Sequence, residues 1–190
     1  MHPAVRTVPG FLSPGECADL MAVCERHGFR EQTDHAGRVI RRRAQFEDAG
    51  WGRVMWDRLR DRVPPLPACY TSDVRPFPAP PRPVEQYRAA GLNERFRCYE
   101  YQPGEMFRPH LDLSHEYPDG RRTFLTVLIF LVGGFEGGGL AFEDGRVDPE
   151  PGLLVLFPHE LRHAGEPVTA GTKITLRTDV VFAPAGEGAA

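Results

Sequence analysis

Lysine is almost absent from this sequence. Of its 23 basic residues, 22 are arginine, and Lys173 is the single lysine. Neither sign of charge is in large excess, and the formal net charge is −3. This charge gives no electrostatic reason to expect nucleic acid or an anionic membrane as a partner. The composition therefore argues against both partners and draws attention to one ammonium group.

The chain also lacks a long hydrophobic run. No apolar stretch approaches the roughly 20 residues that a membrane-spanning helix needs, and the first residues, MHPAVRTVPGFL, contain no signal-peptide core. These absences predict a cytoplasmic protein. With 190 residues, of which 41% are hydrophobic, the chain is long enough for one domain with its own core, and we expect a single domain over residues 1–190.

Closely paired cysteines are missing as well. The four cysteines, Cys17, Cys24, Cys69 and Cys98, form no CxxC motif, which argues against a zinc site or a disulfide framework. Free cysteine behaves as a small hydrophobic residue, and Cys17 and Cys24 are spaced to share one face of a helix. We interpret all four as structural thiols.

The N-terminal part, residues 1–62, has the pattern of helices. Ser13 and Glu16 match a capping box at a helix start, and Gly28 is placed to end that helix. A second helix is predicted over about residues 46–60. Its apolar stripe, which we expect to face the core, contains Trp51, Val54, Met55 and Leu59.

Two further segments of the first half are not helical. Residues 37–43, between the two predicted helices, have a strand pattern. Residues 63–84 contain eight prolines, which cannot donate the backbone hydrogen bonds of a sheet. We expect a stiff surface loop that connects the two parts or flanks the active site, in preference to a docking motif for a proline-recognition domain.

From about residue 93 the sequence changes to short strand patterns. Residues 95–103 have a strand pattern in which successive side chains fall on opposite faces. Residues 122–132 form a continuous apolar run, as in a strand buried on both faces. Two further runs, 152–157 and 172–182, follow after turn residues. The order of elements predicts a mainly β fold with N-terminal helices, in which a double-stranded β-helix (a jelly-roll, cupin-like core) over residues 93–182 is buttressed by the helices.

The segment RPHLDLSH contains two histidines and an aspartate. Side chains alternate along a strand, so His110 and Asp112 point to the same side. An imidazole and a carboxylate on one face are two of the three ligands of a facial iron site. His115 is out of phase with this pair and precedes a turn, so we interpret it as a loop residue.

A third ligand has to come from a distant strand. His159 and His163 have the same parity, so periodicity does not choose between them. The sequence after His163, HAGEPVTAGTKITLR, continues into a β-rich run that contains Lys173, ten residues on. This context favours His163.

Three segments together resemble the catalytic core of the prolyl 4-hydroxylase-like Fe(II)/2-oxoglutarate-dependent oxygenases. They are YQPGEMFRPHLD at 101–112, TFLTVLIFLVGGFEGG at 123–138 and HAGEPVTAGTKITLRTDVVF at 163–182. An HxD motif alone is common, whereas HxD followed about 50 residues later by H-x-G-x-x-V-x-x-G-x-K is specific. The GGGL at 137–140 departs from the Gly-Gly-Glu-Thr that is common in the family.

The resemblance implies that His110, Asp112 and His163 are the catalytic residues and hold Fe(II). It further implies 2-oxoglutarate as cosubstrate, O2 as oxidant and ascorbate as a candidate reductant. Lys173 would bind the far carboxylate of 2-oxoglutarate through a charge-assisted hydrogen bond. Tyr101 would contact the cosubstrate, assisted by Thr126.

Arg177 is four residues past Lys173 on the same strand face, and we group it with the cosubstrate-binding residues. Three roles stay open for it: a bond to the C1 carboxylate of the cosubstrate, a bond to a carboxylate of the substrate, and a structural ion pair with Asp179 or Glu166.

Arg97 and Tyr99 share a face with Tyr101 and are candidate substrate residues at the pocket mouth.

The reaction that the resemblance implies is hydroxylation of an unactivated C–H bond with release of succinate and CO2. We favour a small molecule or amino acid as substrate, since a single compact domain suits such a ligand. A protein hydroxylase that acts on prolyl peptides is the alternative with the same mechanism. A cupin-like module that binds or senses a metal without turnover is the alternative from another class, and it would have no need of Lys173.

Overall fold

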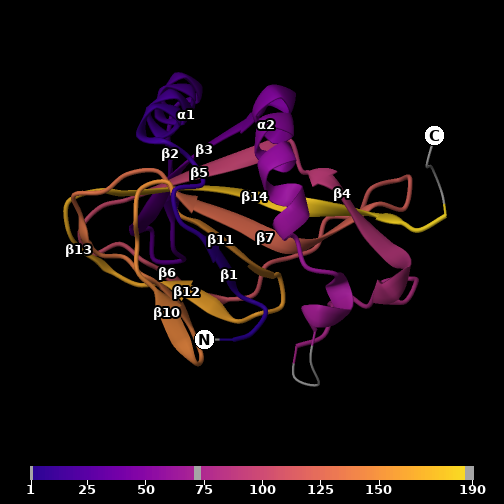
Figure 1. The fold of residues 1–190 in the computed structure, drawn as a ribbon. Helices are drawn as coiled ribbons and strands as arrows, with labels where there is room; N and C mark the ends of the chain where they lie inside the picture. The colour runs from indigo at the N-terminus through magenta and orange to yellow at the C-terminus, as the bar shows by residue number, and fades with distance from the viewer. Residues whose placement is uncertain (1, 71–73, 187–190) are drawn as a thin grey trace.

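Two antiparallel sheets face each other in the computed structural model, which describes residues 2–70 and 74–186 (Figure 1). The larger sheet has the order β1-β11-β7-β14-β5-β3-β2, with β4 also paired to β14, and the smaller has the order β10-β9-β12-β6. The strands of the larger sheet are β1 (Arg6–Val8), β2 (Arg30–Thr33), β3 (Val39–Glu47), β4 (Tyr87–Leu92), β5 (Arg95–Tyr101), β7 (Arg122–Phe130), β11 (Leu154–Pro158) and β14 (Lys173–Pro184). Those of the smaller sheet are β6 (Phe107–His110), β9 (Leu140–Phe142), β10 (Gly145–Val147) and β12 (His163–Gly165), and a separate pair is formed by β8 (Glu136–Gly137) and β13 (Val168–Ala170).

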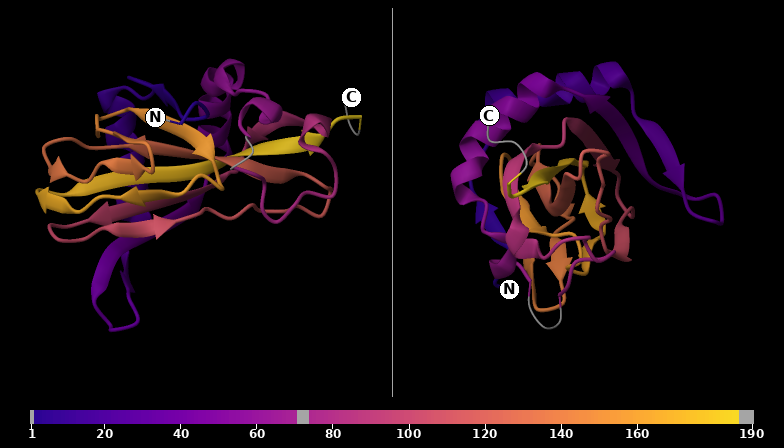
Figure 2. Two further views of the ribbon diagram at one scale, coloured as in Figure 1. Left: turned by 90° about the horizontal axis from the view of Figure 1, so that it is seen from below. Right: turned by 90° about the vertical axis from the view of Figure 1, so that its right-hand side faces the viewer.

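Helices α1 (Pro14–His27) and α2 (Ala49–Leu59) lie on the outer face of the larger sheet (Figure 2). Three short 3-10 helices complete the helical content of the described residues: Arg60–Arg62, Leu66–Ala68 and Val84–Gln86. No helix in the described part of the chain is long and apolar enough to cross a membrane. The prediction of a mainly β fold with N-terminal helices on one side is confirmed.

The capping box of α1 is present as predicted. The Ser13 side chain accepts the backbone N–H of Glu16, the Glu16 carboxylate accepts the backbone N–H of Ser13, and Gly28 ends the helix at a φ of 75°. The Glu16 carboxylate also accepts a hydrogen bond from Arg58, 2.6 Å away on α2, so one side chain caps its own helix and joins it to the next.

The prediction for the second helix needs two corrections. The helix begins at residue 49 and not at 46, because Phe46 belongs to β3 and stacks on Phe96 of β5. Val54 is 41% exposed and does not face the core. The buried stripe consists of Gly52, Met55 and Leu59, and Val54 lies about 100° around the helix axis from Met55.

The N-terminal part also supplies three strands. The strand expected at 37–43 is present as β3, but it runs from residue 39 to residue 47, because it pairs with β5 from Arg42 opposite Glu100 to Glu47 opposite Arg95. Strands β2 and β3 form a hairpin that extends away from the barrel (Figure 2).

The described parts of the proline-rich segment, 63–70 and 74–84, contain no β-strand and pass over the surface. Contacts with the turn after β11 hold this segment down: Glu160 accepts hydrogen bonds from the Phe77 backbone N–H at 2.8 Å and from the Tyr70 hydroxyl at 3.2 Å. Two of its own side chains, Leu66 and Val74, are buried. The segment therefore flanks the loop that leads to His163.

Strand β7 contains a β-bulge. Leu125 pairs with Val180 of β14 and Thr123 pairs with Val181, so Phe124 has no partner on β14. An extra residue of this kind breaks the strict alternation of a strand.

Candidate metal centre and adjoining pocket

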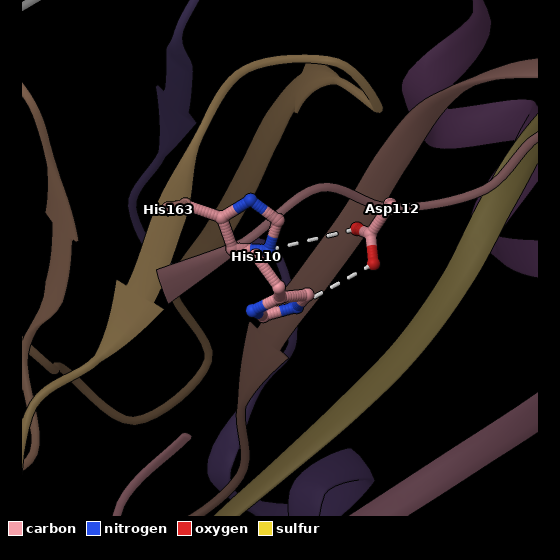
Figure 3. A group of neighbouring side chains, drawn as sticks. All are labelled: His110, Asp112 and His163. Atoms are coloured by element: carbon pink, nitrogen blue, oxygen red, sulfur yellow. Dashed lines mark ion pairs between the residues drawn. The ribbon is translucent and has the colours of Figure 1, made fainter. Parts of the chain in front are cut away.

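His110, Asp112 and His163 converge at one place in the barrel (Figure 3). His110 ends β6 and His163 begins β12, and the two residues are direct partners in the antiparallel pair, which brings their ring centroids within 4.3 Å. Asp112 follows two residues beyond β6. One ligand atom from each residue can be chosen so that all three lie within 4.8 Å of one another.

The two imidazoles present the same nitrogen to this centre. Nδ1 of His110 lies 2.9 Å from the carbonyl oxygen of Arg108, and Nδ1 of His163 lies 2.8 Å from that of Leu161. A carbonyl only accepts, so each Nδ1 carries the proton and each Nε2 keeps its lone pair.

Burial keeps both rings neutral and lowers the pKa of His110 to about 4. The Nε2 atoms of His110 and His163 lie 3.7 and 3.6 Å from the Asp112 carboxylate. Two neutral imidazole nitrogens and one carboxylate fit a divalent iron ion.

The Asp112 carboxylate is buried but bonded on both oxygens. Thr126 donates its hydroxyl proton to Oδ2 at 2.5 Å, and Nη2 of Arg177 lies 3.1 Å from Oδ1. Burial by itself raises the pKa of Asp112. The charge of Arg177 and the hydrogen bond from Thr126 act in the opposite direction and contribute to a pKa below the usual value. The carboxylate is therefore ionised and fixed in orientation.

Lys173 lies inside the pocket that adjoins this centre and has no acidic partner there. Its Nζ donates to the backbone carbonyl of Gly138 at 2.5 Å, and no carboxylate of the described residues lies within ion-pair distance of it. Burial lowers the pKa of Lys173 to about 8. A buried ammonium with a carbonyl as its hydrogen-bond partner fits a ligand that brings a carboxylate.

Gly138 provides the space for this lysine. It adopts a φ of 66°, and a Cβ atom there would lie 2.9 Å from Cδ of Lys173. The GGGL segment thus replaces polar side chains with close backbone contact. Leu140, from the same segment, lines the pocket.

The structure places the other predicted residues at different distances from the centre. Tyr101, which pairs with Lys173 across β5 and β14, lines the pocket together with Tyr99 and Thr126. Arg177 also lines it, and its Nη2 lies 3.1 Å from Asp179 as well as from Asp112. Of the three roles left open for Arg177, an ion pair with Asp179 is present.

Arg97 is not part of this pocket. It lines a second cleft with Arg95, His115 and Tyr117, and it reaches Asp179 at 3.6 Å. His115 lies in the segment after β6, away from the metal ligands, as its strand phase predicts.

Two residues near the centre were not assigned a role from the sequence. Phe107 lines the pocket, with its ring centroid 3.7 Å from that of His110. It lies three residues before His110, so strand alternation places it on the opposite face and gave no signal. His159, the competing candidate for third ligand, is fully buried behind Thr126.

Residues 96–178 match the family model of the 2OG-Fe(II) oxygenase superfamily. A PKHD-type hydroxylase of Sphingopyxis alaskensis is 33% identical over 86 residues, which cover 41% of this chain and 39% of the relative. The match thus spans about two fifths of the length of that relative.

Solved structures share the whole fold. A viral collagen prolyl hydroxylase from Paramecium bursaria Chlorella virus-1, determined with 2-oxoglutarate, has a TM-score of 0.60 at 18% identity, over 95% of this chain and 96% of that one. A Pseudomonas putida prolyl-4-hydroxylase has a TM-score of 0.60 at 20% identity, over 94% and 92%. A Trichoplax adhaerens prolyl hydroxylase, in complex with a hypoxia-inducible-factor peptide, has a TM-score of 0.58 at 17% identity, over 94% and 84%.

Proposed function

We propose that the protein is a 2OG-Fe(II) oxygenase that hydroxylates an unactivated C–H bond of a small molecule or amino acid, because residues 96–178 match the family model of that superfamily and the chain shares its fold with prolyl hydroxylases. The family uses Fe(II), 2-oxoglutarate and O2. When bound, these supply the oxidation: one oxygen atom of O2 enters the C–H bond, and the other enters the succinate formed from 2-oxoglutarate as CO2 leaves.

The observation that carries this proposal is the combination of the triad with a buried lysine that has no carboxylate of the described residues within ion-pair distance. His110, Asp112 and His163 would hold the iron, and Lys173 would take the far carboxylate of 2-oxoglutarate. Tyr101 and the other apolar walls would exclude water from the cosubstrate. A metal-binding module without turnover would not require a charged lysine in the wall of its pocket. Burial of an ammonium group is costly unless a ligand brings a carboxylate to it.

The test is release of succinate from 2-oxoglutarate by the Fe(II)-loaded protein, with ascorbate as reductant. Anaerobic Fe(II) plus 2-oxoglutarate should also give a weak visible charge-transfer band. Asp112→Ala should abolish turnover and remove the band, and Lys173→Ala should strongly reduce turnover at limiting 2-oxoglutarate. A wild-type protein that binds Fe(II) but gives neither band nor succinate would contradict the proposal in favour of a non-catalytic metal site.

The small-molecule preference is supported by the charged wall of the pocket. Arg177 and Lys173 line it beside the triad, and fixed positive charges in an enclosed pocket suit a small substrate that carries a carboxylate. Tyr99, which lines the same pocket, is the candidate for contact with that substrate, whereas Arg97 lines the separate cleft.

A prolyl peptide is the second candidate because of a groove beside the site. This groove, of about 510 Å³, lies between the β2–β3 hairpin (residues 33–40) and residues 104–108, and it reaches Phe107 at the pocket. A panel of amino acids, metabolites and proline-containing peptides, scored by succinate release, separates the two. Stimulation by peptides alone would contradict the small-molecule proposal.

We place the reaction in the cytoplasm as part of the same proposal. The four cysteines are free and buried, which a reducing compartment maintains. Fractionation of expressing cells tests this.

A further inference from the structure

A fully buried histidine stands behind the metal centre without a role in the proposed chemistry. His159 follows β11, and its side chain has no exposed surface. Both ring nitrogens have partners: Nδ1 lies 2.8 Å from Oγ1 of Thr126, and Nε2 lies 3.0 Å from Oγ1 of Thr123. The imidazole is therefore held between two hydroxyl groups of β7.

The direction of each hydrogen bond follows from the number of protons available. The Asp112 carboxylate only accepts, so the hydroxyl of Thr126 donates its single proton there. Thr126 must then accept from His159, which places a proton on Nδ1. A neutral imidazole has no second proton, so Nε2 accepts from the hydroxyl of Thr123. Oγ1 of Thr123 in turn accepts the backbone N–H of His115 at 2.8 Å.

Neutrality of the ring is required for this arrangement. An imidazolium would carry protons on both nitrogens, and the Thr123 hydroxyl would then face a donor with no acceptor of its own among the described residues. The neutral Nδ1–H tautomer gives every group in this series of hydrogen bonds, from the His115 N–H to the Asp112 carboxylate, a partner.

The bulge in β7 makes this two-sided contact possible. Thr123 and Thr126 are three residues apart and would point to opposite sides of a regular strand. Because Phe124 is the extra residue, Thr123 turns to the side of Thr126. Phe124 itself packs edge-on against the rings of Tyr87 and Phe182 on the helix-facing side.

We propose that His159 is a positioning residue for the iron ligand Asp112. Its Nδ1–H directs the hydroxyl proton of Thr126 to Oδ2 of Asp112 and so fixes the plane of the carboxylate before iron binds. The main chain adds to this, because the Asp112 backbone N–H donates to the carbonyl of His159 at 2.8 Å. The inference rests on the proposed function, since it takes Asp112 as a metal ligand.

The tautomer can be measured in the metal-free wild-type protein. Long-range ¹H–¹⁵N correlation spectra at neutral pH should show His159 with a protonated Nδ1 and an unprotonated Nε2, the signals being assigned by their loss in His159→Asn. Thr126→Val removes the acceptor and should shift the ring toward the Nε2–H form. An Nε2–H tautomer or an imidazolium at His159 in the wild type would overturn the proposal, whether or not the protein is an oxygenase.

Two variants of nearly equal size separate hydrogen bonding from packing. In His159→Asn the amide N–H can take the place of Nδ1–H, whereas His159→Leu has no donor. We expect the Co(II) dissociation constant of His159→Asn to stay within about threefold of wild type and that of His159→Leu to rise about 10–100-fold. The visible Co(II) bands should shift in His159→Leu alone. Equal constants for the two variants would overturn the proposal.

The controls distinguish this inference from the function on which it rests. Failure of the wild-type protein to bind Co(II) would overturn the proposed function, and the tautomer measurement would still decide the role of His159 toward Thr126. Thermal melting of the metal-free variants shows whether each is folded. If His159→Leu does not fold, the comparison of Asn with wild type and the Thr126→Val spectrum decide the outcome.

Discussion

The guanidinium of Arg177 lies 3.1 Å from the carboxylate of Asp112, so an internal cation already faces the proposed iron ligand. The same nitrogen lies 3.1 Å from Asp179, and the two carboxylates share it. The side chain is 16% exposed, which leaves little water to screen the interaction. Removal of this cation would leave two buried carboxylates facing each other.

Arg177→Met is expected to destabilise the metal-free protein by roughly 3 kcal/mol, the order of magnitude for breaking a buried ion pair from one side. A divalent ion supplies the missing positive charge, so the variant should bind Co(II) more tightly than wild type. Chemical denaturation with and without Co(II) measures both effects. Weaker Co(II) binding, together with a raised KM for 2-oxoglutarate, would instead assign Arg177 to the cosubstrate.

Affinity for 2-oxoglutarate is expected to fall as the pH rises through the pKa of Lys173, about 8. Below that pH the ammonium is charged and attracts the far carboxylate, and above it the attraction is lost. The KM for 2-oxoglutarate should therefore rise between pH 7 and pH 9. Lys173→Met should raise the KM at pH 7 about 10–100-fold and remove this pH dependence.

The stability of the metal-free protein provides an independent check on Lys173. Its pKa in the folded state lies below the 10.5 of an exposed lysine, so the unfolded chain binds the proton more tightly. The lysine thus reduces stability below about pH 8, and the protein should regain stability as the pH rises from there toward 10.5. Lys173→Met should lack this rise. Equal pH profiles for both proteins would show that the lysine is not desolvated.

Gly138→Ala should weaken 2-oxoglutarate binding and leave the metal ligands in place. The added methyl would lie 2.9 Å from Cδ of Lys173 and 3.1 Å from the ring of Phe135, so the lysine has to move. Gly134→Ala is the matched control, because Gly134 has a similar φ of 75° but open space around it. Both variants lose about 1–2 kcal/mol to backbone strain. Calorimetric titration with 2-oxoglutarate should separate them, and equal affinities would contradict the steric argument.

Glu16→Gln tests the ionic contact between α1 and α2. The hydrogen bond from Arg58 and that from the Ser13 backbone lower the pKa of Glu16 to about 2 from 4.5. Its charge therefore stabilises the fold above about pH 4.5, and this is lost as the pH falls toward 2. Gln keeps the capping geometry, so the variant should lose about 0.5–1 kcal/mol at pH 7 and match wild type near pH 2. If the stability difference between Glu16→Gln and wild type were the same at all pH values, the effect would come from the helix cap and not from the ionic contact with Arg58.

The residues proposed as metal and cosubstrate ligands can be selected from the sequence. His110 and Asp112 share strand parity, and Lys173 stands out as the single lysine, ten residues beyond His163. These relationships are local, or they depend on composition, so no register is needed to find them. The capping box of α1 was predictable for the same reason.

The surroundings of the ligands depend on pairings between distant strands. The contacts of Asp112 with Thr126 and Arg177 require the register of β7 against β14, in which Thr126 lies opposite Asp179. The assignment of Val54 to the core failed for a different reason, since a helix pattern does not state which side meets the sheet. His159 had the parity of a ligand, and parity alone does not place it behind Thr126.

The unpaired Phe124 in β7 makes the number of residues in that strand part of the site's chemistry. Deletion of one residue there would restore regular alternation and turn the Thr123 hydroxyl away from the imidazole, with every proposed metal ligand still in the sequence. Relatives that keep HxD and the distant histidine can therefore differ in these two hydrogen bonds to the imidazole through a change of length alone. A one-residue gap in an alignment of β7 would mark such a difference where no substitution does.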